Sequence, residues 1–156
     1  MSSAHPDFAH VDAQALADSD LLALLKASPG EACRTLNGEV LEIDSARGTA
    51  RFRFEVVPAF CHSQGRICQG GFLTGMVDIT MAHAAIAKGG FKCAVPTLEI
   101  KMSFLEAVGP GTVIAEGRVL RWGGSTGFLE GDIKDEKGRL IVHATCTVKI
   151  VRPKKP

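Results

Sequence analysis

The sequence predicts a single α+β domain, and three observations predict it. A chain of 156 residues has the length of one domain and at that size buries roughly 68–70% of the surface that its unfolded form exposes. One long apolar segment, 66–90, has the length and composition of a helix, and stretches of alternating apolar and polar residues lie on both sides of it. The expected order is therefore a short helix, two strands, one long helix and four strands.

The first helix is expected where clustered leucines follow a capping residue. Ser19 or Asp20 supplies the cap, and Pro29 with Gly30 ends the helix. The residues before it are small and polar with weak periodicity. The expected division of the chain is a flexible segment 1–19, a domain 20–152 and a basic tail 153–156.

The strands are predicted from a period of two. Apolar residues alternate with charged ones over 50–56, and 36–43 is expected to pair with this strand in an antiparallel hairpin across the turn "DSARG". After the long helix the alternation returns, with turns at "WGGS" and "DEKG". The four later strands are expected at 97–104, 112–121, 126–134 and 140–150.

The long helix carries a single carboxylate, Asp78, within a segment that the chain is expected to bury. Apolar residues go nearly all round this helix, which ends at Gly89 and Gly90. The face that contains Asp78 is otherwise made of small residues, namely Gly71, Thr74, Gly75, Ala82 and Ala85. Two interpretations stay open: the face packs tightly and satisfies the acid with hydrogen bonds, or it holds a ligand.

The start of the long helix favours the ligand. Gln69, Gly70 and Gly71 present backbone N–H groups at the positive end of the helix dipole, which suits a phosphate or a developing oxyanion. Asp78 lies eight residues after Gly70, which separates the two by about 12 Å along one helix. If both act on one chemical group, they must come from two copies of the chain, so the spacing predicts a two-fold dimer with shared sites.

Composition excludes several classes of partner. Eighteen basic and seventeen acidic residues leave a formal charge of +1, so we expect no nucleic-acid partner. The longest apolar stretch, 72–87, has 16 residues and falls short of the ~20 that a membrane span needs. Five cysteines show no C-x-x-C spacing, and no leader is recognisable at the first residues. We therefore expect a soluble, cytoplasmic protein with reduced thiols.

Other candidate sites are weaker. Cys61, His62 and Cys68 lack zinc-ligand spacing, so no metal site is expected, and Cys68 is interpreted as a small apolar core residue. His83 lies about 140° round the helix from Asp78, which argues against a dyad between them. Arg51 and Arg53 are expected on an exposed face.

The central region resembles a known family. The stretches "CQGGFLTGMVD" and "TLEIKMSFLEAVGPGT", within a similarity that covers roughly 36–151, resemble the hotdog-fold acyl-CoA thioesterases of the phenylacetate-degradation type. The resemblance implies a curved antiparallel sheet of about six strands around one long central helix. It also implies dimers that pair sheet edges, often joined into homotetramers, and an acyl-CoA or aryl-CoA substrate. Coenzyme A is then part of the substrate, and no separate cofactor is expected.

The resemblance also implies roles for individual residues. The N–H of Gly70, next to Gly71, would polarise the thioester carbonyl, and Asp78 of the other subunit would act as nucleophile or general base. Thr97 would help to orient water or the acid. Ser125 and Thr126 lie where some relatives contact the nucleotide of the coenzyme.

Two residues depart from the family pattern. The family commonly has His before the glycines, where this chain has Gln69, and Asn or Gln seven residues before the first glycine, where it has Ser63. Gln64 or His62 could supply the polar group that Ser63 does not. Hotdog dehydratases are less favoured, because their chemistry needs a His base that is missing at the helix start. A non-catalytic acyl-CoA binder is the alternative, but a pure binder gains nothing from a buried carboxylate, whose desolvation costs several kcal/mol.

Overall fold

The computed structural model describes residues 17–153. Most of the expected N-terminal segment, 1–16, and the end of the basic tail, 154–156, lie outside the described residues. Helix α1 (Asp18–Ala27) begins before the expected cap, and the residue at its N-cap is Ala17, which makes no side-chain cap. The prediction of a cap at Ser19 or Asp20 was therefore wrong. The helix begins earlier because the Asp18 carboxylate accepts hydrogen bonds from the backbone N–H and hydroxyl of Ser45, at 2.9 and 2.5 Å.

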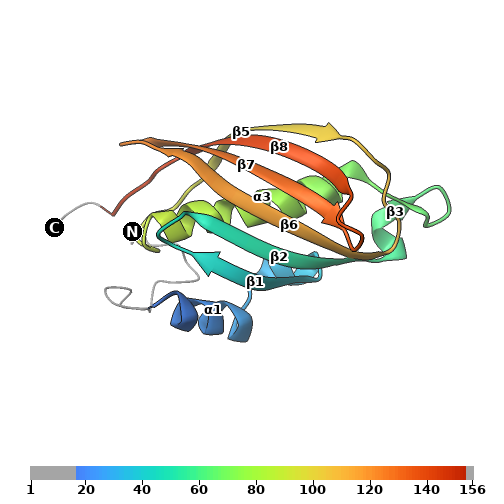
Figure 1. Cartoon of the computed structure of the whole chain (residues 1–156), viewed down its shortest axis with the longest axis horizontal. Helices are drawn as coiled ribbons and strands as arrows, with labels where there is room; N and C mark the ends of the chain where they lie inside the picture. The colour runs from blue at the N-terminus through green and yellow to red at the C-terminus, as the bar shows by residue number, and fades with distance from the viewer. Residues whose placement is uncertain (1–16, 154–156) are drawn as a thin grey trace.

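Six antiparallel strands form the main sheet, in the order β1-β2-β6-β7-β8-β5. The predicted α+β class and the predicted sequence of strands are both confirmed, and Figure 1 shows the sheet curving around the central helix as in the hotdog fold. The strands are β1 (Gly38–Asp44), β2 (Thr49–Val56), β5 (Thr97–Phe104), β6 (Gly111–Trp122), β7 (Thr126–Asp135) and β8 (Leu140–Lys149).

Helix α3 (Gly70–Lys88) is the long helix that the sequence predicts, and it lies directly on the inner face of the sheet. Met76, Val77 and Met81 are fully buried between helix and sheet. Two strand glycines permit this close approach. A Cβ atom on Gly117 would lie 2.9 Å from the backbone of Met81, and one on Gly131 would lie 2.8 Å from the Val77 side chain. The position of α3 therefore depends on positions in β6 and β7 that carry no side chain.

One face of α3 is more open than the sequence predicts. Gly71 is exposed, and Thr74, Gly75, Asp78 and Ala82 are only half-buried in the single chain. The expectation of a helix buried on most sides thus holds for the side that faces the sheet and fails for the side that carries Asp78. The reason is that the sheet covers one side of the helix, whereas the opposite side meets the short N-terminal helix α2 and, at Asp78, the start of the edge strand β5.

Four short elements escape the sequence prediction. They are α2 (Glu31–Thr35), the 3-10 helix η2 (Pro58–Phe60) and a small hairpin of β3 (Cys61–His62) with β4 (Ile67–Cys68). Elements of two to five residues are too short to show a period. The hairpin turn also needs left-handed backbone at Ser63 and Gln64, with φ values of 53° and 61°, which non-glycine residues rarely adopt.

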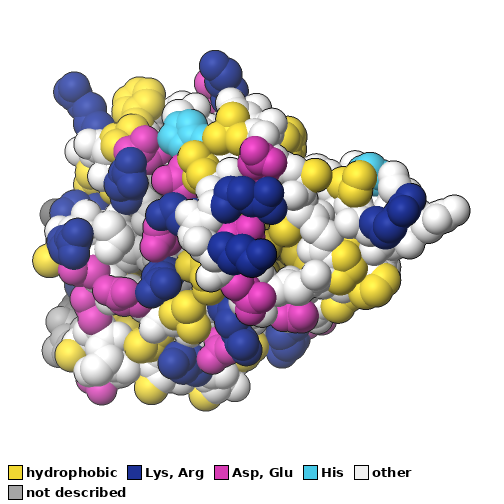
Figure 2. All heavy atoms as spheres, turned by 45° about the vertical axis from the view of Figure 1, so that its right-hand side comes forward, with side chains coloured by type: hydrophobic (Ala, Val, Ile, Leu, Met, Phe, Trp, Pro, Cys, Tyr) yellow, Lys and Arg dark blue, Asp and Glu magenta, His cyan; other side chains and the backbone are white. Residues whose placement is uncertain are grey.

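The two faces of the sheet differ in chemistry. The inner face packs on α3, whereas the outer face carries ion pairs such as Arg53–Glu39 at 2.9 Å and Arg51–Glu116 at 3.5 Å. Arg51 and Arg53 are about half-exposed, which confirms the prediction for this face. Basic and acidic side chains intermingle on the face shown in Figure 2. Within residues 17–153, no helix combines the length and apolar character that a membrane span requires.

Candidate active site

Asp78 lies at the middle of α3, on its open face, and lines a pocket of 200 Å³. The wall opposite α3 comes from the N-terminal helices and includes Leu25, Ala32 and Cys33, and Ile79 belongs to the α3 side. The Asp78 carboxylate thus lies in a mainly apolar groove between α2 and α3, which Glu31 of α2 also lines. An arrangement of this kind can hold an apolar group next to the Asp78 carboxylate.

Thr97 orients the carboxylate. Its hydroxyl donates a hydrogen bond of 2.9 Å to Oδ1 of Asp78, and β5 begins at this residue. No described residue donates to Oδ2 of Asp78, so this oxygen can accept from a bound water molecule. The resemblance implies that Thr97 helps to orient water or the acid, and this hydrogen bond is a contact that such a role would use.

Cys146 lies beneath the pair and is nearly fully buried. Burial, together with the nearby charge of Asp78, raises the pKa of the Cys146 thiol to about 11, although a hydrogen bond with Thr97 opposes the rise. The thiol is therefore neutral near pH 7, and Cys146 adds neither a second negative charge nor a thiolate nucleophile to the site.

The start of α3 offers one free donor. Gln69 is the N-cap, and its side-chain oxygen accepts the N–H of Gly71 at 2.6 Å. The Gly71 N–H, which the sequence predicts as a possible donor to a substrate, is thus already hydrogen-bonded within the protein. The first N–H groups of a helix have no partner within the helix, and no described residue accepts from the N–H of Gly70. Gly70 is therefore the donor that remains for a substrate oxygen.

Gly70 opens onto a second pocket, of 360 Å³, that Ile67, Leu73, Phe104 and Leu105 help to line. A Cβ atom at Gly70 would lie 2.9 Å from the Phe104 ring, so any larger residue would displace this ring. Gly70 and Asp78 line separate pockets on the same helix, as the predicted separation of about 12 Å requires.

The remaining predicted residues lie away from both pockets. His62 at the end of β3 and Ser63 and Gln64 in the following turn are exposed in the β3–β4 hairpin, and Ser63 Oγ contacts His62 Nδ1 at 2.9 Å. Figure 1 shows this hairpin projecting beyond the end of the sheet. The described lining of the Asp78 and Gly70 pockets includes none of these three residues.

Ser125 and Thr126 lie at the turn from β6 to β7. The neighbouring Trp122 packs near Gly89, just past the C-terminal end of α3. This turn is therefore at the opposite end of the helix from Gly70 in the same chain. Arg152, which donates to the carbonyl of Gly124, adds a positive charge at the same turn.

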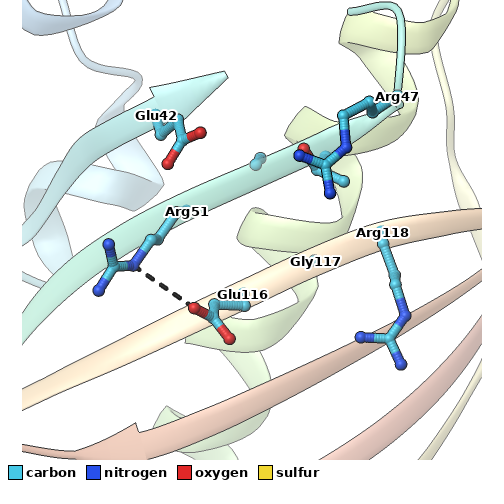
Figure 3. Close-up of a pocket in the computed structure, with 8 residues that line it drawn as sticks. Glu42, Arg47, Arg51, Glu116, Gly117 and Arg118 are labelled. Carbon is cyan, nitrogen blue, oxygen red and sulfur yellow. Dashed lines mark ion pairs between the residues drawn. The ribbon is translucent and has the colours of Figure 1, made fainter. Parts of the chain in front are cut away.

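A third pocket, of 260 Å³, lies on the outer side of β1, β2 and β6 (Figure 3). Its charged residues are largely paired with one another or with neighbours, since Arg51 contacts Glu116 and Arg118 contacts Glu130. None of the predicted site residues lines it. Within residues 17–153, no group of three or more His, Cys, Asp or Glu side chains is arranged to hold a metal ion.

Sequence reasoning missed two features of the site. The α2 wall with Cys33 was missed because a five-residue helix shows no period, although Gly30 followed by Glu31 is a typical helix start. The contact of Phe104 with Gly70 had no sequence signal, because it joins residues 34 positions apart. His83 does line the Asp78 pocket, but its Nδ1 contacts the Ile79 carbonyl at 2.8 Å and its ring packs on Phe52.

Comparisons with known proteins agree with this architecture. Residues 66–142 match the model of the thioesterase superfamily. "Putative esterase SSO2140" of Saccharolobus solfataricus is 34% identical over 91 residues, which are 58% of this chain and 64% of that protein. The aligned part of the chain thus spans just under two thirds of the length of this curated relative.

Solved structures extend the likeness over most of the chain. A phenylacetic acid degradation-related protein of Ralstonia eutropha JMP134 is 26% identical with a TM-score of 0.75, covering 84% of this chain and 97% of that one. The PaaI protein of the Escherichia coli phenylacetic acid degradation operon has a TM-score of 0.76 at 17% identity, covering 88% and 96%. The second likeness concerns the fold alone.

Proposed function

Residues 66–142 of this hotdog-fold chain match the thioesterase superfamily, and from that premise we propose that the protein hydrolyses acyl-CoA or aryl-CoA thioesters to a carboxylic acid and free coenzyme A. The observation that carries the proposal is the Asp78–Thr97 pair at the mouth of an apolar pocket. A thioester needs an activated water or a carboxylate nucleophile next to a cavity for its acyl group. Asp78 can meet this need in either role through its Oδ2 atom.

Each active site is proposed to take residues from two chains, because β5 contacts both Asp78 and Gly70. Thr97, at the start of β5, bonds Asp78, and Phe104, at its end, packs against Gly70. Antiparallel pairing of β5 with β5 of a second copy would place the start of one strand beside the end of the other. Asp78 of one chain would then approach Gly70 of the other.

The surface of β5 supports such pairing. β5 is an edge strand, and Leu98 and Phe104 on it are 61% and 52% exposed. With the two-fold axis at Ile100, Glu99 of one copy would face Lys101 of the other, a pairing of opposite charges that contributes about 0.2–1 kcal/mol. Dimers that pair again into tetramers remain part of the proposal.

The proposed reaction assigns one task to each group. The Gly70 N–H donates to the thioester oxygen as negative charge develops on it, a contribution of the order of 10²–10³ in rate. Asp78 either takes a proton from water that attacks the carbonyl carbon or attacks the carbon itself, while Thr97 holds Oδ1. Collapse of the tetrahedral intermediate breaks the carbon–sulfur bond, and the coenzyme leaves as a thiol after it takes up a proton.

The Asp78 pocket suggests the size of the acyl group. A cavity of about 150 Å³ lined by aliphatic side chains is large enough for benzene, so 200 Å³ suits a phenyl-sized or medium-length acyl group. Leu25 and Ile86 contribute to its walls. The more open 360 Å³ pocket beside Gly70 is then available to the long pantetheine arm, which must reach solvent.

A non-catalytic acyl-CoA binder is the second candidate, and one observation favours it. Gln69 replaces the usual His and is committed to capping Gly71, and Ser63 lies on an exposed turn instead of lining either pocket. A hydrolysis assay over acetyl, octanoyl, palmitoyl and phenylacetyl esters of coenzyme A decides between the two. We expect thiol release with octanoyl and phenylacetyl esters ahead of palmitoyl. Tight binding without any thiol release would establish the binder.

A further inference from the structure

Two cysteines face each other across the β3–β4 hairpin that leads into α3. Cys61 and Cys68 are directly opposite in the antiparallel register. The N–H of Gln69 donates to the carbonyl of Phe60 at 2.9 Å. This hydrogen bond flanks the Cys61–Cys68 pair on the side away from the hairpin turn. Cys61 and Cys68 therefore occupy a non-hydrogen-bonded position of the ladder, where opposite Cα atoms are closest, at about 4.5 Å.

We propose that Cys61 and Cys68 are a modification site that closes to a reversible intramolecular disulfide. A disulfide joins Cα atoms about 4.4–6.8 Å apart, with Cβ atoms about 3.8 Å apart, and the narrow pair of an antiparallel hairpin meets the first condition. Both thiols are free in the structure. Four turn residues connect the two strands of the hairpin, and the antiparallel register holds the two cysteines opposite each other.

The two thiols have different parts in the reaction. Cys61 is half-exposed, whereas Cys68 is buried, and burial together with the neighbouring Cys61 raises the pKa of the Cys68 thiol to about 11. Cys61 is therefore the thiol that attacks a small disulfide oxidant such as oxidised glutathione, forming a mixed disulfide and releasing one thiol. Cys68, as it loses its proton, then attacks the Cys61 sulfur and releases the second thiol. Two protein thiols are oxidised, and one oxidant disulfide is reduced to two thiols.

Closure would act on the proposed oxyanion donor, and this consequence rests on the proposed function. Cys68 is followed directly by Gln69 and by Gly70, the first residue of α3. Cβ atoms of directly opposite strand residues are about 4.5 Å apart or a little more, so closure to a disulfide must shift the Cβ atoms of Cys61 and Cys68 by roughly 0.5–1 Å relative to each other. A misplacement of about 1 Å can cost 10²-fold in rate. We expect the oxidised protein to lose at least tenfold in kcat and to recover it with a dithiol reductant.

The test equilibrates the full-length protein in glutathione buffers from reducing to oxidising, blocks free thiols by alkylation and maps cross-linked peptides by mass spectrometry. Activity is followed by the ultraviolet absorbance of the thioester bond, because a thiol reagent would react with glutathione. The expected result is a Cys61–Cys68 peptide that accumulates as kcat falls. C61S, which keeps a hydroxyl near the Val57 carbonyl, should form no cross-link and keep its activity in oxidising buffer.

C93A is the matched control, since Cys93 is buried away from the hairpin and its loss should leave both the cross-link and the inhibition intact. Absence of the Cys61–Cys68 peptide from folded protein in the most oxidising buffer would overturn the site. A complete cross-link with unchanged kcat would overturn the effect on Gly70. If the protein hydrolyses no thioester at all, the proposed function fails, and the peptide map still decides whether the disulfide forms.

Discussion

At the scale of the residue, the site depends on the few hydrogen bonds that the Asp78 carboxylate and the Gly70 N–H make within the protein. Asp78 has one oxygen held by Thr97 and the other without a described donor, and Gly70 keeps an unbonded N–H because Gln69 caps the next residue instead. A general base and an oxyanion donor both need an atom that the protein holds in position but does not already hydrogen-bond.

Asp78→Asn should fold normally and lose at least about 10²-fold in kcat, because the amide can neither take a proton from water nor attack a carbonyl. The measurement is steady-state hydrolysis of an octanoyl or phenylacetyl ester, with a thermal melt to check the fold. Asp132→Asn is the matched control: Asp132 pairs with His143 at 2.7 Å on the outer face of the sheet, and kcat should not change. Retention of more than about a tenth of turnover by Asp78→Asn would exclude the role.

Gln69→Ala should lose both stability and activity. Removal of the cap on Gly71 costs about 0.5–2 kcal/mol of unfolding free energy, and the loosened helix start should lower kcat tenfold or more by misaligning the Gly70 N–H. Gln69→His should retain activity, because its ring can make a similar hydrogen bond. Urea unfolding and kinetics are measured on the same preparations. A destabilised Gln69→Ala protein with normal kcat would limit Gln69 to the cap.

At the scale of the element, α3 fixes the distance between Gly70 and Asp78 within one chain. Its sheet-facing side is held by close packing over Gly117 and Gly131, and the start of the helix is held by the Gln69 cap and the β3–β4 hairpin. The open side meets α2 and forms the pocket around Asp78. The position of the helix on the sheet thus sets both the core and the site.

Gly117→Ala should destabilise the protein by about 1–3 kcal/mol, because the added methyl group overpacks a dense core. Its Cβ would lie 2.9 Å from the Met81 backbone and from the Thr80 carbonyl oxygen, and backbone cannot rotate aside. Gly124→Ala serves as the comparison, since no atom lies within 4 Å of its Cβ, and it should change stability by no more than about 0.5 kcal/mol. Equal unfolding free energies for the two variants in urea would contradict this account of helix packing.

At the scale of the whole molecule, the single chain contains the parts of the proposed site but does not assemble them. Gly70 and Asp78 line different pockets. The exposed edge strand β5 contacts both residues, through Thr97 at Asp78 and through Phe104 at Gly70. A two-fold pairing through β5 would complete two equivalent sites, each with one half from either chain.

Mixing two inactive variants should restore activity. Asp78→Asn lacks the acid, and Gly70→Val blocks the donor with a side chain that meets the Phe104 ring. After unfolding and refolding as an equal mixture, half of the dimers are mixed and each has one intact site, so about a quarter of wild-type activity should return. The measurement is thioester hydrolysis alongside sedimentation. A wild-type protein that is fully active as a monomer, or a mixture with no regained activity, would refute the shared site.

The sequence by itself determined the elements and the chemical groups. Period-two alternation located the strands, and the glycine-led apolar segment located α3 with Asp78 and Gly70 a fixed distance apart, because these features depend on residues near one another in the chain. Tertiary structure decided what depends on distant partners. The start of α1 follows from Ser45, the pocket beside Asp78 needs α2, and Phe104 closes on Gly70 from another strand. The openness of the Asp78 face was decided in the same way, since a helix that is apolar all round does not reveal which side the sheet covers.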